Sequence, residues 1–148
     1  MHPYPHTYTA AARAEPSGPV PVTSPSVPEL ATTPPPQFDG PEGYWSPETL
    51  LTAAVANCFI LTFRAISRAA RLEWLRLECT VEGVLDKAAG VTQFTRFDSH
   101  ATLTVAAGTD ENKAKQLLEK AEHVCLVANS LRGERTLQTR ILVTHGGQ

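Results

Sequence analysis

The clearest pattern in the chain is an apolar run over residues 50–63, which only three polar residues interrupt. Such a run covers nearly every face of a helix, and a helix that is apolar on every face is buried on every face. The uncharged stretch, residues 49–63, is shorter than the roughly 20 residues that a helix needs to cross a bilayer. The pattern therefore predicts a long central helix in the core or in a dimer interface, and no membrane span.

Both ends of this helix are marked in the sequence. Ser46 offers a hydroxyl for the N-cap, Pro47 suits the first helical position, and a carboxylate follows in the first turn. Three arginines come after the apolar run and complement the negative end of the helix dipole, namely Arg64, Arg68 and Arg71. We therefore expect the helix to begin at about residue 47 and to end among these arginines.

After the arginines the apolar period changes from that of a helix to that of a strand. Apolar and polar residues alternate over 75–85, and a second alternating stretch runs from 91 to about 105. The residues between them, 86–90, end in glycine and suit a turn. Two long strands with so short a connection predict an antiparallel hairpin.

The rest of the chain predicts a second helix and a last strand. Asp110 is placed to cap this helix. Its amphipathic stripe consists of Ala114, Leu117, Leu118 and Ala121. The helical pattern breaks near His123, a short apolar turn follows over 125–131, and alternation returns over 136–144. The order is extended arm, buried helix, hairpin, helix and strand, which predicts an α+β domain.

Proline divides the chain in two. All twelve prolines lie between Pro3 and Pro47, and each one fixes φ and removes a backbone donor. This stretch therefore cannot be mainly helix or central strand: residues 7–13 suit one short strand, and the valines at 20–27 suit at most an edge strand. We accordingly expect a Pro-rich extended arm over 1–37, partly ordered or strand-forming, and a domain over 38–148.

Composition and charge exclude several classes of function. With 42% hydrophobic residues, the chain of 148 residues can bury a sizeable core. A net charge of −2 gives no electrostatic footprint for nucleic acid or for an anionic membrane surface. Three cysteines are too few for a secreted disulfide scaffold, and the N-terminus lacks the basic and apolar regions of a signal peptide. We expect a cytoplasmic protein with no nucleic-acid or membrane partner.

The three cysteines are the candidates for chemistry, and their surroundings differ. Cys79 lies on the apolar side of a strand, where a small core residue is expected. Cys58 lies in the middle of the buried helix, and composition alone favours a structural role. Cys125 lies at a helix break, where N–H groups of the next turn could stabilise a thiolate, although an inert packed thiol fits equally well. A dyad with His123 lacks an orienting third group, and no closed zinc-ligand spacing is present.

The segments around Cys58 and Cys125 each carry a recognisable motif. In the first, 38–59, an aromatic-acidic-Gly turn precedes the Pro-Glu helix start, and a Cys-Phe pair follows ten residues beyond the glutamate. In the second, 120–131, the cysteine stands in Lys-Ala-Glu-His-Val-Cys-Leu-Val-Ala-Asn-Ser-Leu. Together the two segments resemble the paired signatures of the OsmC/Ohr family of organic hydroperoxide reductases. The element order matches from about residue 38 to the C-terminus.

This resemblance implies an OsmC-like α+β fold, in which an antiparallel sheet packs on a long buried central helix and two chains form an intertwined homodimer. It also implies a thiol-dependent peroxidase that needs no metal and no bound cofactor. Cys58 is then the peroxidatic residue, which attacks an organic hydroperoxide as a thiolate and becomes a sulfenic acid. Cys125 is the resolving thiol that condenses with it, and a small dithiol such as a lipoyl group reduces the disulfide.

Two further catalytic residues follow from the resemblance. Glu48 and Cys58 are ten residues apart, about 15 Å along a straight helix, so one site needs a bridging arginine or a Glu from another subunit. Because Cys58 is in mid-helix, the N-terminus of its own helix cannot lower its pKa, and we expect a cation to do so. Some family members carry this arginine where the chain has Gln37. Others take it from the N-terminal arm, where Arg13 is the only arginine.

The sequence leaves two other hypotheses beside the peroxidase. A non-catalytic OsmC-like protein could bind a small hydrophobic ligand in an apolar pocket at the dimer interface, with both cysteines lining it. In a purely structural alternative, Cys58 and Cys125 only fill the core. The two matching cysteine segments favour the enzyme.

Overall fold

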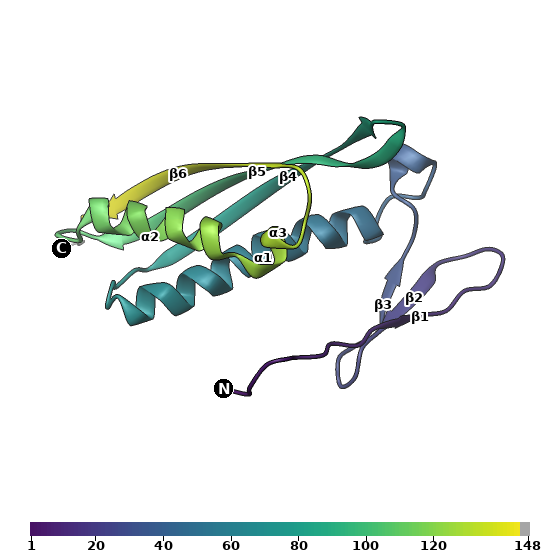
Figure 1. Cartoon of the computed structure of the whole chain (residues 1–148), viewed down its shortest axis with the longest axis horizontal. Helices are drawn as coiled ribbons and strands as arrows, with labels where there is room; N and C mark the ends of the chain where they lie inside the picture. Colours follow the sequence, from purple (N-terminus) through teal and green to yellow (C-terminus); the bar gives the residue numbers. More distant parts are fainter. Residues whose placement is uncertain (146–148) are drawn as a thin grey trace. The chain divides into compact units, whose positions relative to one another are not determined.

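The helices and strands follow one another in the predicted order (Figure 1). The computed structural model describes residues 1–145, so residues 146–148, the end of the predicted domain, lie outside the described part. Three short strands come first, followed by a long helix, a hairpin, two further helices and a last strand. The chain divides into two units, Met1–Leu51 and Thr52–Gln148. The predicted α+β class is confirmed.

The first unit contains a three-stranded antiparallel sheet of β1 (Ala11–Ala12), β2 (Val20–Thr23) and β3 (Leu30–Thr32). The prediction of at most an edge strand near residue 20 is wrong, because β2 is the central strand. It tolerates Pro21 because the proline nitrogen faces β1, where the ladder is only two residues long. On the same side the Pro21 carbonyl accepts a hydrogen bond from the Arg13 N–H at 3.3 Å.

A tight turn follows this sheet. The short 3-10 helix η1 (Pro36–Phe38) ends at Asp39, which has a positive φ of 61°. At Gly40 the backbone comes so close to its neighbour that a Cβ atom there would lie 1.8 Å from the Pro34 carbonyl oxygen. Only glycine fits such a close approach, so the acidic-Gly pair of the sequence motif shapes this turn.

The long helix α1 (Pro47–Ala69) begins where the sequence predicts it. The Thr49 N–H donates a hydrogen bond to Ser46 Oγ at 3.1 Å, and the Ser46 N–H donates in return to Thr49 Oγ1 at 2.9 Å. This reciprocal pair is a capping box in which threonine stands in the place of Glu or Gln. Glu48 lies in the first turn and Arg68 in the last, as the helix dipole favours.

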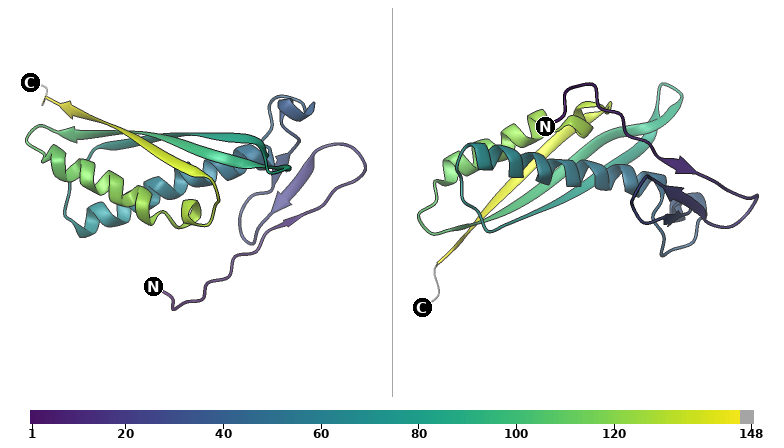
Figure 2. Two further views of the ribbon diagram at one scale, coloured as in Figure 1. Left: turned by 45° about the horizontal axis from the view of Figure 1, so that its top comes forward. Right: turned by 90° about the horizontal axis from the view of Figure 1, so that it is seen from below.

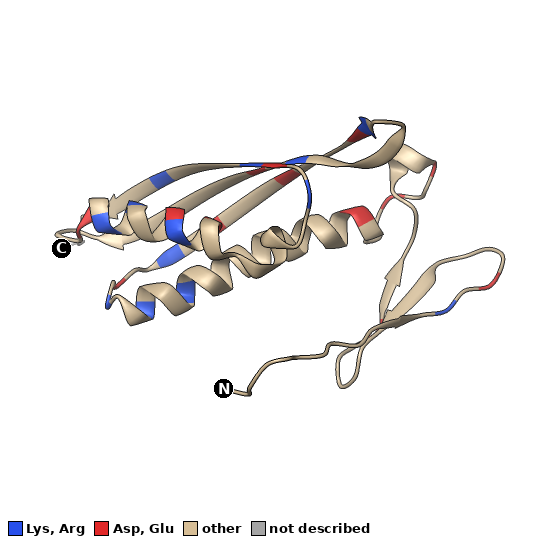
Figure 3. Ribbon diagram, viewed as in Figure 1, with Lys and Arg blue, Asp and Glu red and all other residues tan. Residues whose placement is uncertain are grey.

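Only one stripe of α1 is buried within the chain. It consists of Val55, Phe59, Phe63 and Ser67, which are spaced four residues apart. The predicted burial on every face is not reached within one chain, in which Leu61 is 50% exposed, and burial of the other faces in a dimer interface stays a prediction. A helix that packs against one core covers one stripe, and the rest of its surface carries no charge between Glu48 and Arg64 (Figure 3). By length and composition α1 could cross a membrane, but a core helix passes the same test.

The second unit contains a three-stranded sheet in the order β4-β5-β6. The strands β4 (Arg76–Ala88) and β5 (Val91–Ala106) form the predicted antiparallel hairpin. Its connection is shorter than expected, because positions 86–88 pair with β5 and only Ala89 and Gly90 form the turn. Both turn residues have positive φ, 50° and 77°, which is the backbone twist that joins two strands through two residues.

The last strand, β6 (Glu134–Thr144), lies parallel to β5, so the sheet is mixed and the prediction of an antiparallel sheet holds only for the hairpin. The chain leaves β5, passes through α2 (Glu111–Val124) and α3 (Leu126–Asn129) and returns in the same direction, and such a crossover gives a parallel pair. The helices α1 and α2 lie on the same face of this sheet (Figure 2). The core of the unit includes Phe59, Phe63, Leu77, Leu103, Val105, Leu118 and Ala121.

Candidate functional site

The candidate site forms at the end of α2. This helix begins as predicted, with the Asp110 carboxylate accepting a hydrogen bond from the Lys113 N–H at 3.0 Å, and it ends at Val124. Cys125 then takes an extended conformation, with φ −63° and ψ 107°, before the short helix α3. The first amides of a helix have no partner within it. The N–H groups that follow Cys125 are therefore available to a neighbouring group.

That neighbouring group is the thiol of Cys58 on α1. Its Sγ lies 3.8 Å from the hydroxyl of Thr62, one turn further along the helix. Burial raises the pKa of Cys58, but hydrogen bonds outweigh burial and hold this pKa below its ordinary value. The donors are the Val127 N–H, the Cys125 thiol, the Thr62 hydroxyl and the Leu126 N–H. Amides of another segment thus lower this pKa, and the contribution of a cation stays a prediction.

Cys125 has the opposite character. Its side chain is 0% exposed, and burial raises the pKa of its thiol to about 11. The Ala128 N–H lowers this pKa, whereas the hydrogen bond to Cys58, the charge of Cys58 and the Glu122 carboxylate raise it. The two thiols therefore form a hydrogen-bonded pair in which Cys58 is the thiol that loses its proton first, while Cys125 keeps its own. A thiolate is stabilised at this helix break, as the sequence suggested, but it belongs to Cys58.

Cys79 lies on β4, where it is half-buried and packs against the core, as its place in the strand predicts. Burial raises the pKa of its thiol to about 11, and the charges of Glu122 and Cys125 raise it further. These charges place Cys79 near the end of α2, but its thiol stays protonated at neutral pH. All three cysteines are free thiols.

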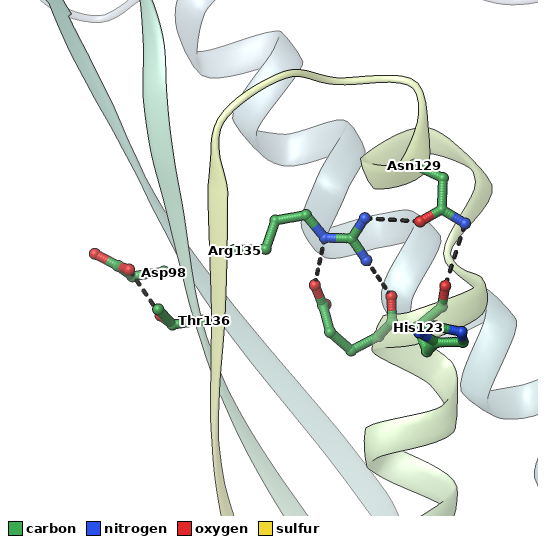
Figure 4. A network of polar contacts seen from close by, with 6 residues as sticks. Asp98, His123, Asn129, Arg135 and Thr136 are labelled. Atoms are coloured by element: carbon green, nitrogen blue, oxygen red, sulfur yellow. Dashed lines mark hydrogen bonds and ion pairs between the residues drawn. The ribbon is translucent and has the colours of Figure 1, made fainter.

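A network of hydrogen bonds connects residues before and after the break at Cys125, and Figure 4 shows Arg135, Asn129 and His123 within it. Arg135, near the start of β6, donates from Nε to Glu122 Oε1 at 2.8 Å and from Nη1 to Asn129 Oδ1 at 2.7 Å. Its Nη2 donates to the Glu122 carbonyl. Asn129 in turn donates from Nδ2 to the His123 carbonyl at 3.2 Å. The side chains of Arg135 and Glu122 are only 22% and 15% exposed, so solvent screens this ion pair less than a surface pair.

Of the four predicted site residues, the structure brings Cys58 and Cys125 together in the second unit. Glu48 lies in the first turn of α1, within the first unit. Arg13 belongs to the first unit as well, and its guanidinium forms an exposed ion pair with Glu29 at 3.0 Å. The catalytic roles of Glu48 and Arg13 stay predictions.

Sequence reasoning missed most of the groups that act on the thiol pair or hold the segment around it. Glu122 and Arg135 stand at a helix end and at a strand start, where charged residues are ordinarily solvated, so no local pattern marks them. Thr62 does carry a signal, because residues four apart share one face of a helix. Throughout residues 1–145, no group of three or more His, Cys, Asp or Glu side chains could hold a metal ion.

A cavity of about 520 Å³ lies near the other end of α1. Arg64, Arg68, Leu72 and Trp74 are among its lining residues. The indole of Trp74 donates from Nε1 to the buried Ser67 Oγ at 2.9 Å, which fixes one wall. None of the three cysteines lines this cavity, so it is separate from the thiol pair.

The comparisons with known proteins agree with this fold. A family model described as OsmC-like protein matches residues 40–140, which is more than half of the chain. The chain therefore belongs to the OsmC-like protein family. The uncharacterised protein YmaD of Bacillus subtilis is 28% identical over 130 residues, which cover 86% of this chain and 82% of YmaD.

Solved structures show the same fold. An OsmC-like protein of unknown function from Vibrio cholerae superposes with a TM-score of 0.82 at 16% identity, covering 90% of this chain and 99% of its own. An organic hydroperoxide resistance protein, OsmC, from Legionella pneumophila superposes with a TM-score of 0.72 at 25% identity, covering 93% of this chain and 97% of its own. The OsmC-like fold expected from the sequence is thus confirmed.

Proposed function

We propose that the protein is a thiol-dependent peroxidase that reduces organic hydroperoxides, with Cys58 as the peroxidatic and Cys125 as the resolving cysteine. The observation that carries this proposal is the division of roles within one hydrogen-bonded pair. The pKa of Cys58 is lowered and the pKa of Cys125 is raised to about 11. A peroxidatic cysteine must be a thiolate to attack the peroxide, whereas a resolving cysteine must lie within reach of the sulfenic acid that forms.

In the first step, the Cys58 thiolate attacks the terminal oxygen of the hydroperoxide and breaks the O–O bond. The sulfur is oxidised to a sulfenic acid, and the alkoxide that leaves takes up a proton to become the alcohol. The amides of Leu126 and Val127 and the hydroxyl of Thr62 stabilise the thiolate before the attack. The step needs no metal ion, because the peroxide itself is the oxidant.

In the second step, the Cys125 sulfur attacks the sulfur of the sulfenic acid. A disulfide forms, and the hydroxyl leaves as water with the proton that Cys125 gives up. A small dithiol then reduces the disulfide to two thiols and becomes a cyclic disulfide itself. The net reaction converts a hydroperoxide and a dithiol into an alcohol, water and a disulfide.

Apolar surface beside both thiols supports an organic peroxide as the substrate. Leu61 lies three residues after Cys58 on α1 and is 50% exposed, and Leu126 directly follows Cys125 and is 69% exposed. An alkyl or aryl group can cover such surface on binding, whereas hydrogen peroxide has no apolar part to do so. The Legionella relative is itself named for resistance to organic hydroperoxides.

We further propose that Glu48 and Arg13 complete the catalytic site and that the protein acts as a homodimer. The apolar surface of α1 supports the dimer, because only one stripe of this helix is buried within the chain and the rest is left partly exposed. A second copy that covers this face would remove the apolar surface from water. Sedimentation equilibrium of the wild type, with Leu61→Lys as the variant expected to weaken association, tests this part.

The peroxidase is tested by free-thiol titration before and after one equivalent of cumene hydroperoxide, with hydrogen peroxide in a parallel series. We expect the wild type to lose two thiols rapidly and faster with the organic peroxide, and Cys125→Ser to accumulate a sulfenic acid. The matched control is Cys79→Ser, which should still lose two thiols. Survival of all three thiols in the wild type would refute the proposal and favour a non-catalytic, ligand-binding role.

A further inference from the structure

The residues on either side of Cys125 are joined by one side chain. Arg135 reaches from β6 to Glu122, three residues before the cysteine, and to Asn129, four residues after it. The guanidinium thereby serves three acceptors: a carboxylate, a backbone carbonyl and a side-chain amide oxygen (Figure 4). Arginine suits this task because its planar group presents five N–H donors in a fixed geometry, which a lysine ammonium cannot match.

We infer that Arg135 is a positioning residue for the thiol pair. It holds the segment 125–127 in place against Cys58, and it neutralises the Glu122 carboxylate that lies beside the resolving thiol. The arrangement is read directly from the contacts, and its consequence for turnover rests on the proposed peroxidase function.

The positioning follows from how the segment is held at its two ends. The amides of Leu126 and Val127 hydrogen-bond to Cys58, and neither of them is a partner of Arg135. Their place depends on residues 122 and 129, which Arg135 connects. The hydrogen bond from Asn129 to the His123 carbonyl at 3.2 Å closes the segment on itself. Without the guanidinium, the segment keeps only its local hydrogen bonds, such as that from the Asn129 N–H to the Cys125 carbonyl, and the donors to Cys58 are held less firmly.

The electrostatic part follows from the charges around Cys125. Three titratable groups interact with its thiol: Cys58 from α1, Cys79 from β4 and Glu122 from α2. A fourth charged group, Arg135 from β6, forms an ion pair with Glu122. The Glu122 carboxylate raises the pKa of both Cys125 and Cys79. Arg135 compensates this charge at 2.8 Å. If the cation is removed, Cys125 ionises less readily and attacks the sulfenic acid more slowly.

The test uses the full-length reduced protein with the variants Arg135→Gln, Arg135→Lys and Glu122→Gln. The matched control is Arg140→Gln, because Arg140 lies on the same strand but with its side chain exposed on the opposite face. The first readout is the pH profile of iodoacetamide alkylation at each cysteine, resolved by peptide mass spectrometry, which involves no peroxide. The second readout is the rate of disulfide closure after one equivalent of cumene hydroperoxide.

We expect Arg135→Gln to move the alkylation midpoint of Cys58 upward by about one pH unit, which is about a tenfold smaller ionisation constant for this thiol. Disulfide closure should slow by about tenfold as well. Arg135→Lys should recover part of the closure rate, because it keeps the charge but loses the fork of donors. Glu122→Gln should move the midpoints of Cys79 and Cys125 downward, and Arg140→Gln should match the wild type.

An unchanged Cys58 profile in a folded Arg135→Gln protein would overturn the positioning role. A Cys125 midpoint that rises in both Arg135→Gln and Glu122→Gln would overturn the electrostatic role. A loss of charge must move the midpoint in opposite directions in these two variants, whereas a looser segment moves it in the same direction in both. If circular dichroism shows that Arg135→Gln does not fold, the test depends on Glu122→Gln. Alkylation midpoints of Cys79 and Cys125 that do not fall in this variant would refute the inference. Shifted alkylation profiles in a protein that ignores peroxide would refute the peroxidase alone.

Discussion

The raised pKa of Cys79 makes the stability of the fold depend on pH in a way that one substitution can isolate. Burial, and then the charges of Glu122 and Cys125, raise this pKa to about 11 in the folded protein. In the unfolded chain a cysteine titrates near its ordinary value of about 8.5. Between these two values the folded state keeps a proton that the unfolded chain has released. The free energy of unfolding therefore falls as the pH rises through this window, and the contribution is fully present below it.

The magnitude follows from the distance between the two pKa values. A pH of about 10 lies about 1.5 pH units above the pKa of the unfolded thiol. Each pH unit corresponds to about 1.4 kcal/mol in the free energy of unfolding. Between about pH 7.5 and about pH 10, Cys79 should thus cost the wild type about 2 kcal/mol of stability. Cys79→Ala removes this term, so its free energy of unfolding should fall by about 2 kcal/mol less over the same interval.

The assay is urea denaturation of both proteins at the two pH values, in the presence of a phosphine reductant and at one fixed protein concentration, since association shifts apparent stability. All other titrating groups are common to the two proteins and cancel in the difference. The control is Thr80→Ala, the exposed neighbour of Cys79 on β4, which should keep the pH dependence of the wild type. Equal pH dependence in the wild type and in Cys79→Ala would refute the charged, buried environment described for the end of α2.

Three further predictions test other parts of the structure. At about pH 7, limiting iodoacetamide should modify Cys58 at least about a hundredfold faster than the other two thiols, because their pKa values of about 11 leave them protonated. Peptide mass spectrometry measures the rate at each cysteine. Leu118→Ala, at a position that is 0% exposed, should lower the free energy of unfolding by about 3–5 kcal/mol in urea, whereas Leu142→Ala, at 38% exposed, should cost less than about 1 kcal/mol. Gly40→Ala should disrupt the turn at the Pro34 carbonyl and increase proteolysis of the first unit, and an unchanged digestion pattern would contradict the close approach.

Local patterns were sufficient for most elements of the fold. The cap at Ser46, the alternation over 91–105 and the cap at Asp110 each depend on residues a few positions apart, and the structure has each of them in place. The direction of β6 could not be read in this way, because an alternating strand looks the same whether it runs parallel or antiparallel to its neighbour. Only the crossover through α2 and α3 decides it.

The chemistry of the site depends on groups that meet across elements, and these are the part that the sequence leaves open. The amide donors to Cys58 come from residues 126 and 127, more than sixty positions away, and backbone amides carry no residue-type signal. The contact between Arg135 and Glu122 likewise forms only when the chain folds, and in the sequence each residue looks like a solvated charge. Cys58 and Cys125 were nevertheless found, because their motifs resemble the paired signatures of the family.

The claim that Cys58 and Cys125 form one redox pair is tested most directly by locating the disulfide that the peroxide creates. Wild-type protein is treated with one equivalent of cumene hydroperoxide, its remaining thiols are blocked, and its peptides are mapped by mass spectrometry without reduction. The account predicts a single cross-link between Cys58 and Cys125, with Cys79 recovered in the blocked form. A cross-link that contains Cys79, or oxidised Cys58 with no cross-link to Cys125, would contradict it.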